Sequence, residues 1–261
     1  MPMYCLPEMA DANAAFWMEL QQRLCARGVD TAGIKLESDE SSVPEGIGRG
    51  TFFTQICGYP LFKHYRDQGI ILATPHYAAP GCVGSTHRAF FMVRVDDPAE
   101  RLEDLRGRIF GCNSLLSNSG MNLPRLSLAR IAHSKPFFSS VIMTGGHVAS
   151  LQRLGDRSID VCSIDSVTWG FFGKFRPIAA QRYRILDETV AARRCLSLLQ
   201  CTQPNRMQRL LPRPCKRSWR ILKLPTCVES WDSSAFQLRT LLPMNISRNT
   251  STKPLYSAFP R

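Results

Sequence analysis

Three small polar residues and a glycine stand together in the segment SLLSNSGMN, residues 114–122. Ser117, Asn118 and Ser119 can each form a hydrogen bond through the side chain, and Gly120 lets another group approach the backbone closely. Because Ser and Asn are preferred N-cap residues, the segment predicts the start of a helix. Free N–H groups and the helix dipole make such a start an anion site. The segment therefore indicates anion binding, with an ordinary capped helix as the alternative.

Two further residues could contact the same anion. His147 follows two glycines in TGGHVASL and opens a predicted helix, where the helix dipole disfavours protonation of the ring. We expect a neutral His147 that donates a hydrogen bond to an anion. Asp165 stands between IDVCSI and SVTWGFF, where it either caps the next helix or contacts a ligand. The histidines at 64, 87 and 133 have no partner pattern and are expected in packing or surface roles.

No pattern in the sequence indicates catalysis, a metal or a cofactor. The nucleophile elbow G-x-S-x-G and the Walker A loop are absent, and the Ser117 and Ser119 hydroxyls have no evident general base. The ten cysteines include no C-x-x-C pair and lie among apolar residues, which predicts buried free thiols. No apolar run is long enough for a membrane span. These observations favour binding without turnover, with no catalytic residue, metal or cofactor.

The elements that must position these residues alternate between strand and helix. A helix is expected in LPEMADANAAFWMELQQRLCARGVD, followed by strand and helix segments from GTFFTQICGYPLFKHY to RYRILDETV. This alternation predicts an α/β protein with mostly parallel sheets, whose ligands bind at the carboxyl ends of the strands. The polar residues at those ends form the candidate set: Thr54, Gln55, Tyr59, His76, Tyr77, Ser117, Asn118, Ser119, Thr144, His147, Asp165 and Ser166.

Charge is distributed unevenly along the chain. Residues 1–190 hold 20 Lys/Arg against 19 acidic residues, whereas residues 191–261 hold 13 Lys/Arg against two acidic residues. All 17 glycines precede residue 190. One interpretation of this tail is a basic arm that binds nucleic acid or an anionic surface. The favoured interpretation is a frame-shifted sequence that does not fold, because basic arms are usually poor in Cys, Trp and Leu and this tail is not.

Six segments in order resemble the phosphate/phosphonate-type solute-binding proteins of ABC importers, the PhnD-like family. They are FTQICGYPL, ATPHYAAPGC, FFMVRVDDPAERLEDLRGR, NSLLSNSGMN, TGGHVASL and IDVCSIDSVTW, and the resemblance covers about residues 3–190. It implies a type II periplasmic-binding fold of two α/β lobes joined by crossover strands, with a ligand cleft between them. The implied organisation is the N-terminal part of lobe one at 1–86, lobe two with the crossover strands at 87–190, and the atypical tail at 191–261.

The resemblance also implies a binding site and partners. The helix start at Ser117, Asn118, Ser119 and Gly120 corresponds to the family's phosphonate-binding segment, and His147 to its histidine. An aromatic wall corresponds to Tyr59 and Tyr77, and Asp165 to an acidic residue that faces a ligand amine. The implied protein is a periplasmic monomer that binds phosphate, phosphite or phosphonate for an ABC permease and does not bind nucleic acid.

The sequence departs from this family at both ends of the resemblance. The family's first strand would precede Pro2, and no signal peptide is readable, so as written the chain would stay in the cytoplasm. The family returns to lobe one through a segment like LPF[VI]T, where this chain has ARRCLSLL. We therefore expect lobe one to be incomplete, with apolar surface exposed around Phe52, Phe53 and Ile56. A non-functional, truncated or frame-shifted product is the further alternative.

Overall fold

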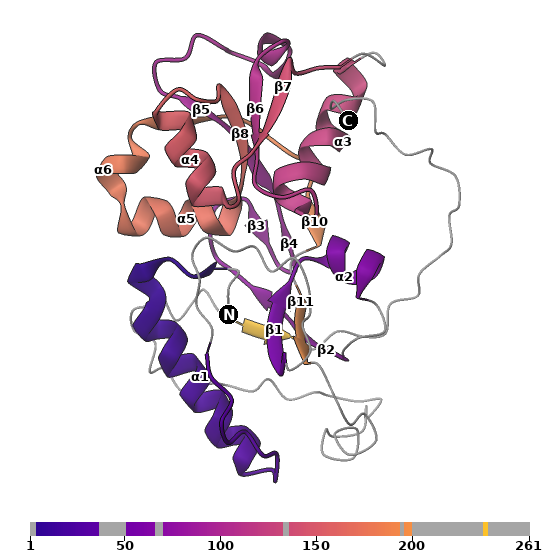
Figure 1. Cartoon of the computed structure of the whole chain (residues 1–261), viewed down its shortest axis with the longest axis vertical. Helices are drawn as coiled ribbons and strands as arrows, with labels where there is room; N and C mark the ends of the chain where they lie inside the picture. The colour runs from indigo at the N-terminus through magenta and orange to yellow at the C-terminus, as the bar shows by residue number, and fades with distance from the viewer. Residues whose placement is uncertain are drawn as a thin grey trace. The chain divides into compact units, whose positions relative to one another are not determined.

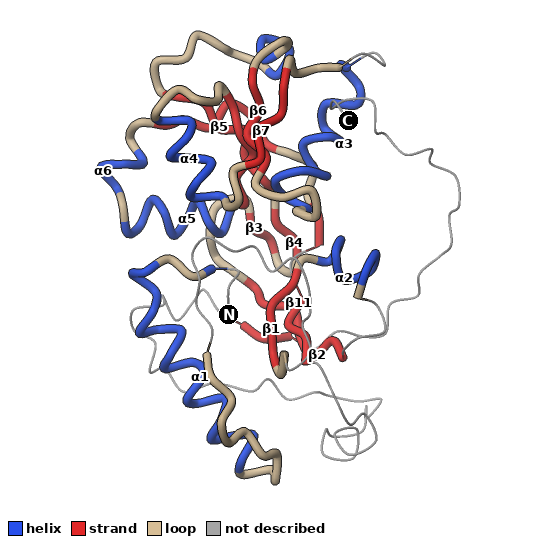
Figure 2. The backbone as a smooth tube through the Cα atoms, viewed as in Figure 1, coloured by secondary structure: helices blue, strands red, loops and turns tan. Residues whose placement is uncertain are grey.

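The computed structural model describes residues 4–36, 51–65, 70–132, 136–193, 196–199 and 237–239 of the 261-residue chain. These residues form two compact units, each with its own helices and strands (Figures 1 and 2). Unit 1 contains the described residues up to 78 together with 196–199 and 237–239. Unit 2 contains the described residues from 79 to 193. The predicted α/β class with two lobes is confirmed, and the predicted cleft between the lobes stays a prediction.

Unit 1 is built on a four-stranded sheet in the order β1-β11-β2-β12. Its elements are the 3₁₀ helix η2 (Pro7–Met9), α1 (Ala10–Cys25), β1 (Phe53–Ile56), α2 (Gly58–His64), β2 (Ile70–His76), β11 (Leu196–Leu199) and β12 (Gln237–Arg239). Strand β11 lies between β1 and β2 and is antiparallel to both (Figure 1). A segment far along the chain therefore supplies a central strand of this sheet.

The N-terminal helix of unit 1 follows its sequence signals. Pro7 occupies the first turn of η2, where a missing N–H costs nothing, and Asp11 lies in the first turn of α1, where the dipole favours a negative charge. Met9 and Trp17 are buried. The chain leaves the helix through Gly28, whose φ of 75° lies in the region that glycine adopts most readily. The predicted helix is confirmed.

Unit 2 is built on a five-stranded sheet in the order β7-β6-β8-β5-β9. Its elements are β3 (Cys82–Val83), β4 (Thr86–His87), β5 (Ala89–Arg94), η3 (Leu102–Leu105), β6 (Ile109–Cys112), the π-helical turn η4 (Asn118–Asn122), α3 (Leu123–Ala132), β7 (Ser140–Met143), α4 (His147–Gly155), β8 (Val161–Asp165), α5 (Ser166–Phe175), α6 (Pro177–Ala180), β9 (Tyr183–Glu188) and β10 (Ala192–Arg193). A small sheet, β10-β4-β3, accompanies the large one.

The large sheet of unit 2 is mixed, and the strand pairs of the other two sheets are antiparallel, so the prediction of mostly parallel sheets is wrong. Strand β6 is parallel to β7 and β8, but β5 is antiparallel to β8 and β9. The physical reason is that β5 enters from the end of the sheet opposite to β6, β7, β8 and β9. Hydrophobic patterns identify strands but do not report their direction.

Apolar residues cover both faces of the large sheet of unit 2. Along β5, Phe91 and Val93 belong to one buried cluster and Phe90 and Met92 to the other, as side chains alternate along a strand. The first cluster includes Leu128 of α3, and the second includes residues of α4 and α5. Helix α3 thus covers one face of the sheet while α4 and α5 cover the other (Figure 1).

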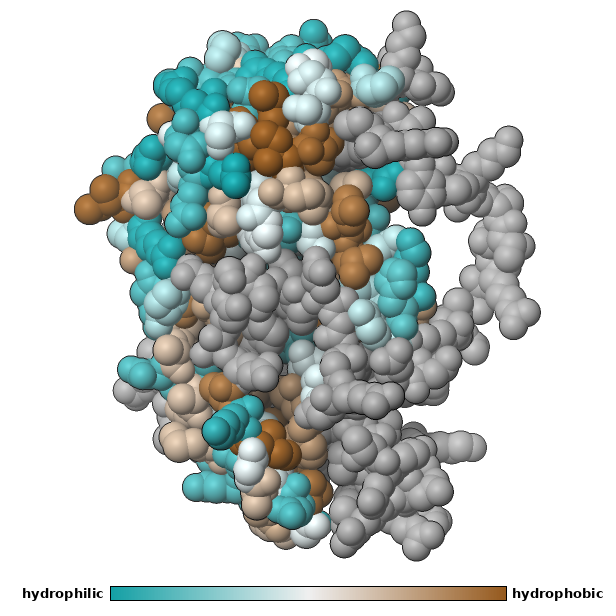
Figure 3. Space-filling model, in the orientation of Figure 1, coloured by the Kyte–Doolittle hydropathy of each residue, from teal (hydrophilic) through white to brown (hydrophobic). Residues whose placement is uncertain are grey.

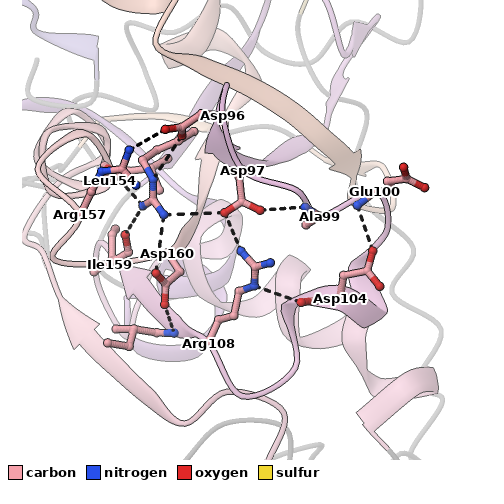
Figure 4. A network of polar contacts seen from close by, with 12 residues as sticks. Asp96, Asp97, Ala99, Glu100, Asp104, Arg108, Leu154, Arg157, Ile159 and Asp160 are labelled. Atoms are coloured by element: carbon pink, nitrogen blue, oxygen red, sulfur yellow. Dashed lines mark hydrogen bonds and ion pairs between the residues drawn. The ribbon is translucent and has the colours of Figure 1, made fainter.

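A network of charged side chains fixes the end of this sheet where β6 and β8 begin (Figure 4). Arg108 donates to Asp97 Oδ2 at 2.6 Å, and the carboxylate of Asp160 accepts from the backbone N–H of Ile109 at 2.9 Å. Arg94 donates to the carbonyl oxygen of Ile159 at 3.0 Å. These charged groups pair with one another, and the candidate site lies at the opposite end of the sheet, where β6, β7 and β8 have their carboxyl ends.

Several further expectations can be compared with the described residues. The expected exposure of apolar surface is wrong at Ile56, which is only 1% exposed and lies in β1, the partner of β11, whereas Phe52 and Phe53 are half-buried. The thiols of Cys5, Cys57, Cys112 and Cys162 are buried, as predicted, whereas that of Cys25 is exposed. The basic-arm and frame-shift interpretations of residues 191–261 fall mainly on residues outside the described part, which there includes only 191–193, β11 and β12.

The visible surface of unit 2 is mainly hydrophilic, with hydrophobic side chains in separate patches (Figure 3). One such patch stands out over α6, where Ile178 is 82% exposed. Across the described ranges, no helix combines the length and the apolar character that a membrane span requires.

Candidate functional site

The helix start after β6 has the structure that the sequence predicts. Ser117 is the N-cap, and its Oγ accepts a hydrogen bond from the N–H of Gly120 at 3.0 Å. The helix begins with the π-helical turn η4 and continues as α3. The first N–H groups of a helix have no acceptor within it, and π-helical turns are frequent at functional sites. Ser117, Ser119 and Gly120 are buried, and Asn118 is half-buried.

His147 meets this helix start. Gly146 is the N-cap of α4 and His147 is its first residue, so the ring is held at the carboxyl end of β7. Nε2 of His147 lies 3.0 Å from Oγ of Ser119, and either atom can donate the hydrogen bond. Ser163 of β8 donates from its Oγ to the carbonyl oxygen of Ser119 at 2.7 Å, which anchors the helix start to the sheet. Two segments 28 residues apart thus converge on Ser119.

Burial is the main influence on the titration of His147. Desolvation lowers the pKa of its imidazole below the ordinary value of 6.5, while the negative charge of Asp165 and the backbone of Ser163 oppose that shift less strongly. His147 is therefore neutral at pH 7. The ring offers one N–H donor and one acceptor, which agrees with the neutral donor expected from the sequence.

The side chain of Asp165 caps the helix that follows it, α5. Its Oδ1 accepts from the N–H groups of Val167 and Thr168 at 2.8 and 3.2 Å, which makes it the N-cap of α5. Its Oδ2 lies 3.2 Å from Nε2 of His87, and both side chains are almost fully buried. The sequence had given His87 a packing or surface role, and no spacing linked it to Asp165. A role for Asp165 toward a ligand amine stays a prediction.

The two predicted aromatic residues both lie in unit 1. Tyr77 is buried, packs edge to face on Tyr4 with ring centroids 5.3 Å apart, and accepts from Gln55 Nε2 at 3.4 Å. Tyr59 is half-buried in α2, and its hydroxyl accepts from Nζ of Lys63 at 2.7 Å. Their predicted role as an aromatic wall beside the ligand stays a prediction.

The chemistry available at the helix start is hydrogen bonding by neutral groups. Hydroxyls, backbone N–H groups and a neutral imidazole can surround an oxyanion without a fixed positive charge. The sequence shows no evident general base for Ser119, and the structure places His147 within hydrogen-bond distance of it. Sequence spacing does not reveal this pair, since 28 residues separate them. Across the described ranges, no group of three His, Cys, Asp or Glu residues could hold a metal ion.

Comparison with known families gives a match over most of the chain. Residues 7–210 match the sequence profile of a family described as "ABC transporter, phosphonate, periplasmic substrate-binding protein". The matched segment runs past residue 190, so residues 191–210 lie within the family's pattern rather than outside it as the sequence interpretation had placed them. No relative was found among curated proteins.

Solved structures with a similar fold are distant in sequence. A binding protein component of an ABC phosphonate transporter from Pseudomonas aeruginosa matches with a TM-score of 0.58 at 13% identity, covering 76% of this chain and 67% of that one. PhnD1 from Prochlorococcus marinus, in complex with methylphosphonate, matches with a TM-score of 0.55 at 14% identity, covering 75% and 72%. The Xanthomonas citri protein XAC2383, bound to chloride, matches with a TM-score of 0.50 at 19% identity, and the aligned part spans 62% of each chain.

Proposed function

Since the chain belongs to the family of periplasmic substrate-binding proteins of phosphonate ABC transporters, we propose that it binds a phosphate-, phosphite- or phosphonate-type oxyanion at the η4–α3 helix start. The observation that carries this proposal is the meeting of Ser119 and His147, 3.0 Å apart, at a capped helix N-terminus. Ser117, Asn118, Ser119, Gly120 and His147 are the residues proposed to contact the anion. Tyr59, Tyr77 and Asp165 are proposed to contact the rest of the ligand.

The mechanism replaces the water around the anion with groups that are already in place. The first N–H groups of the helix point along the dipole toward a bound anion. The Ser119 hydroxyl and the His147 ring bond each other without ligand. When an anion arrives, the hydroxyl can rotate its hydrogen toward an anion oxygen, and the neutral ring can donate through its one N–H. Because the anion is charged, each such bond is shorter and stronger than a bond between neutral groups.

We propose that the ligand is bound and released without chemical change. A Ser–His pair can activate a nucleophile in other settings. A site complementary to the ground state of the ligand lowers the energy of that state and so gives no acceleration. The proposed partner is an ABC permease, with the protein acting as a monomer in the periplasm. Phosphorus NMR of bound and released methylphosphonate should therefore show one unchanged compound.

The proposal is tested by calorimetric titration of the full chain with methylphosphonate, phosphite and phosphate. A Ser117→Ala/Ser119→Ala variant should bind the preferred anion at least about 100-fold more weakly, since each bond to a charged group contributes about 1.5–3 kcal/mol. The matched control is Ser127→Ala/Ser139→Ala, which makes the same chemical change farther along α3 and in the segment before β7. It should bind like the wild type.

Loss of the Ser117 cap also weakens the helix by about 1 kcal/mol, so folding must be checked. Circular dichroism should show that the double variant keeps the wild-type spectrum at the temperature of the titration. Undiminished oxyanion binding in a folded Ser117→Ala/Ser119→Ala variant would place the site elsewhere. Absence of binding by the wild type to any of the three anions would overturn the proposed ligand class.

A further inference from the structure

Asn113 is a buried polar residue to which the sequence analysis had assigned no role. It is the first residue after β6 and only 3% exposed. Among the described residues, neither Nδ2 nor Oδ1 of its side chain has a hydrogen-bond partner. Most buried polar side-chain atoms in proteins are hydrogen-bonded, and an unsatisfied amide destabilises the fold. A ligand that bonds this amide would supply the missing partner and explain why the residue is kept in a buried position.

The amide of Asn113 lies directly over the helix start. A Cβ built on Gly120 would stand 1.7 Å from Oδ1 and 2.7 Å from Cγ of Asn113, and 3.2 Å from Oγ of Ser117. The side chain of Asn113 therefore occupies the space that any residue other than glycine would fill at position 120. Three groups therefore lie close together: the amide of Asn113, the capping hydroxyl of Ser117 and Gly120, the third residue of η4.

We propose that Asn113 is a ligand-binding residue of this site and that its amide completes the set of donors around the oxyanion. This inference rests on the proposed function, because it assigns one more contact to the same anion. An Asn amide offers two donors and an acceptor on one planar group. One N–H can bond a charged oxygen of the ligand, and Oδ1 can accept from a protonated one. Gly120 permits this arrangement because it lacks a side chain.

The alternative is that Asn113 has a structural role. A structural amide contributes to stability, so its removal should lower the melting temperature and leave affinity unchanged. A ligand-binding amide without a partner gives the opposite result. Its removal should leave the melting temperature unchanged or raise it, because the cost of the unsatisfied group disappears, and should weaken ligand binding.

Asn113→Ala should bind the preferred anion about 10- to 100-fold more weakly than the wild type, as expected for the loss of one bond to a charged group. Its melting temperature without ligand should stay within about 2 °C of the wild type or rise. Ser127→Ala is the matched control. Oγ of Ser127 in α3 is likewise buried and without a hydrogen-bond partner among the described residues. Its removal should have the same small effect on stability and no effect on affinity.

A second variant keeps the test decisive if Asn113→Ala does not fold. Asn113→Ser retains a donor on a shorter side chain, and it should bind more tightly than Asn113→Ala yet more weakly than the wild type. If the wild type binds the anion and both Asn113→Ala and Asn113→Ser bind it equally tightly, Asn113 is not a ligand-binding residue, and the proposed function still stands. Failure of the wild type itself to bind methylphosphonate, phosphite or phosphate would overturn the proposed function.

Discussion

A methyl group added at Gly120 tests the packing of the helix start most sharply. The added Cβ would stand 1.7 Å from Oδ1 of Asn113, far closer than two such atoms can approach, so the amide must move. Asn113 is buried, and its displacement disturbs packed neighbours. Overpacking of this kind costs about 1–3 kcal/mol, while Gly→Ala in a helix gains up to about 1 kcal/mol. We expect Gly120→Ala to lower the free energy of unfolding by about 1–2 kcal/mol.

Gly173→Ala is the matched control for this change. Gly173 lies in α5, and a Cβ built there meets no atom within 4 Å. The substitution should therefore raise the free energy of unfolding by up to about 1 kcal/mol, because only the gain in helix propensity remains. The two Gly→Ala substitutions should thus change the free energy of unfolding in opposite directions.

Urea denaturation followed by circular dichroism measures both variants, and equal m-values are required before their free energies are compared. In an Asn113→Ala background the clash disappears, so Gly120→Ala should become neutral or stabilising there. The coupling energy between the two sites should reach about 0.5–3 kcal/mol. A Gly120→Ala variant that is as stable as Gly173→Ala, or a loss that persists in the Asn113→Ala background, would refute the reasoning.

Two of the remaining predictions concern unit 2, and the third concerns the sheet of unit 1. Asp165→Ala should destabilise the protein by about 3–5 kcal/mol in thermal melts, because α5 loses its cap and buried His87 loses its carboxylate, whereas Asp165→Asn keeps a capping side chain and should cost less. Burial lowers the pKa of His147 in the folded protein, so the unfolded chain takes up the imidazole proton first as the pH falls through 6.5, and the stability of the fold should decrease over that pH range. His147→Gln should therefore reduce the slope of melting temperature against pH. An unchanged slope would contradict the burial of the ring. A chain ending at residue 190 lacks β11, so amides of β1 and β2 should exchange with solvent faster than in the full chain, and unchanged protection would show that β11 does not contribute to the sheet.

The elements and the helix start could be predicted because their signals are local. Capping residues, glycines and hydrophobic periodicity identify α1, the strand–helix alternation and the N-cap at Ser117 within a few residues of sequence. The reversed direction of β5 could not be predicted in this way, because direction is set by how the chain enters the sheet. The pairing of β11 with β1 and β2 joins segments more than 100 residues apart and has no local signal either.

The site was predictable in part for the same reason. Ser119 and His147 were identified separately, each as a polar residue at a helix start, but their hydrogen bond depends on the sheet that brings β6 and β7 together. His87 and Asn113 gave no usable signal. A single Asn after a strand resembles an ordinary turn residue. Only the structure shows that its amide fills the space beside Gly120, seven residues later, that a Cβ would occupy.

The central claim is that an oxyanion binds at the η4–α3 helix start. The most direct measurement is an NMR titration of the labelled full chain with methylphosphonate, with inorganic chloride as the control anion. We predict that the backbone amides of Asn118, Ser119 and Gly120 and the ring of His147 show the largest saturable shifts, and that chloride at equal concentration does not reproduce them. Saturable shifts confined to residues outside this helix start and α4 would contradict the account.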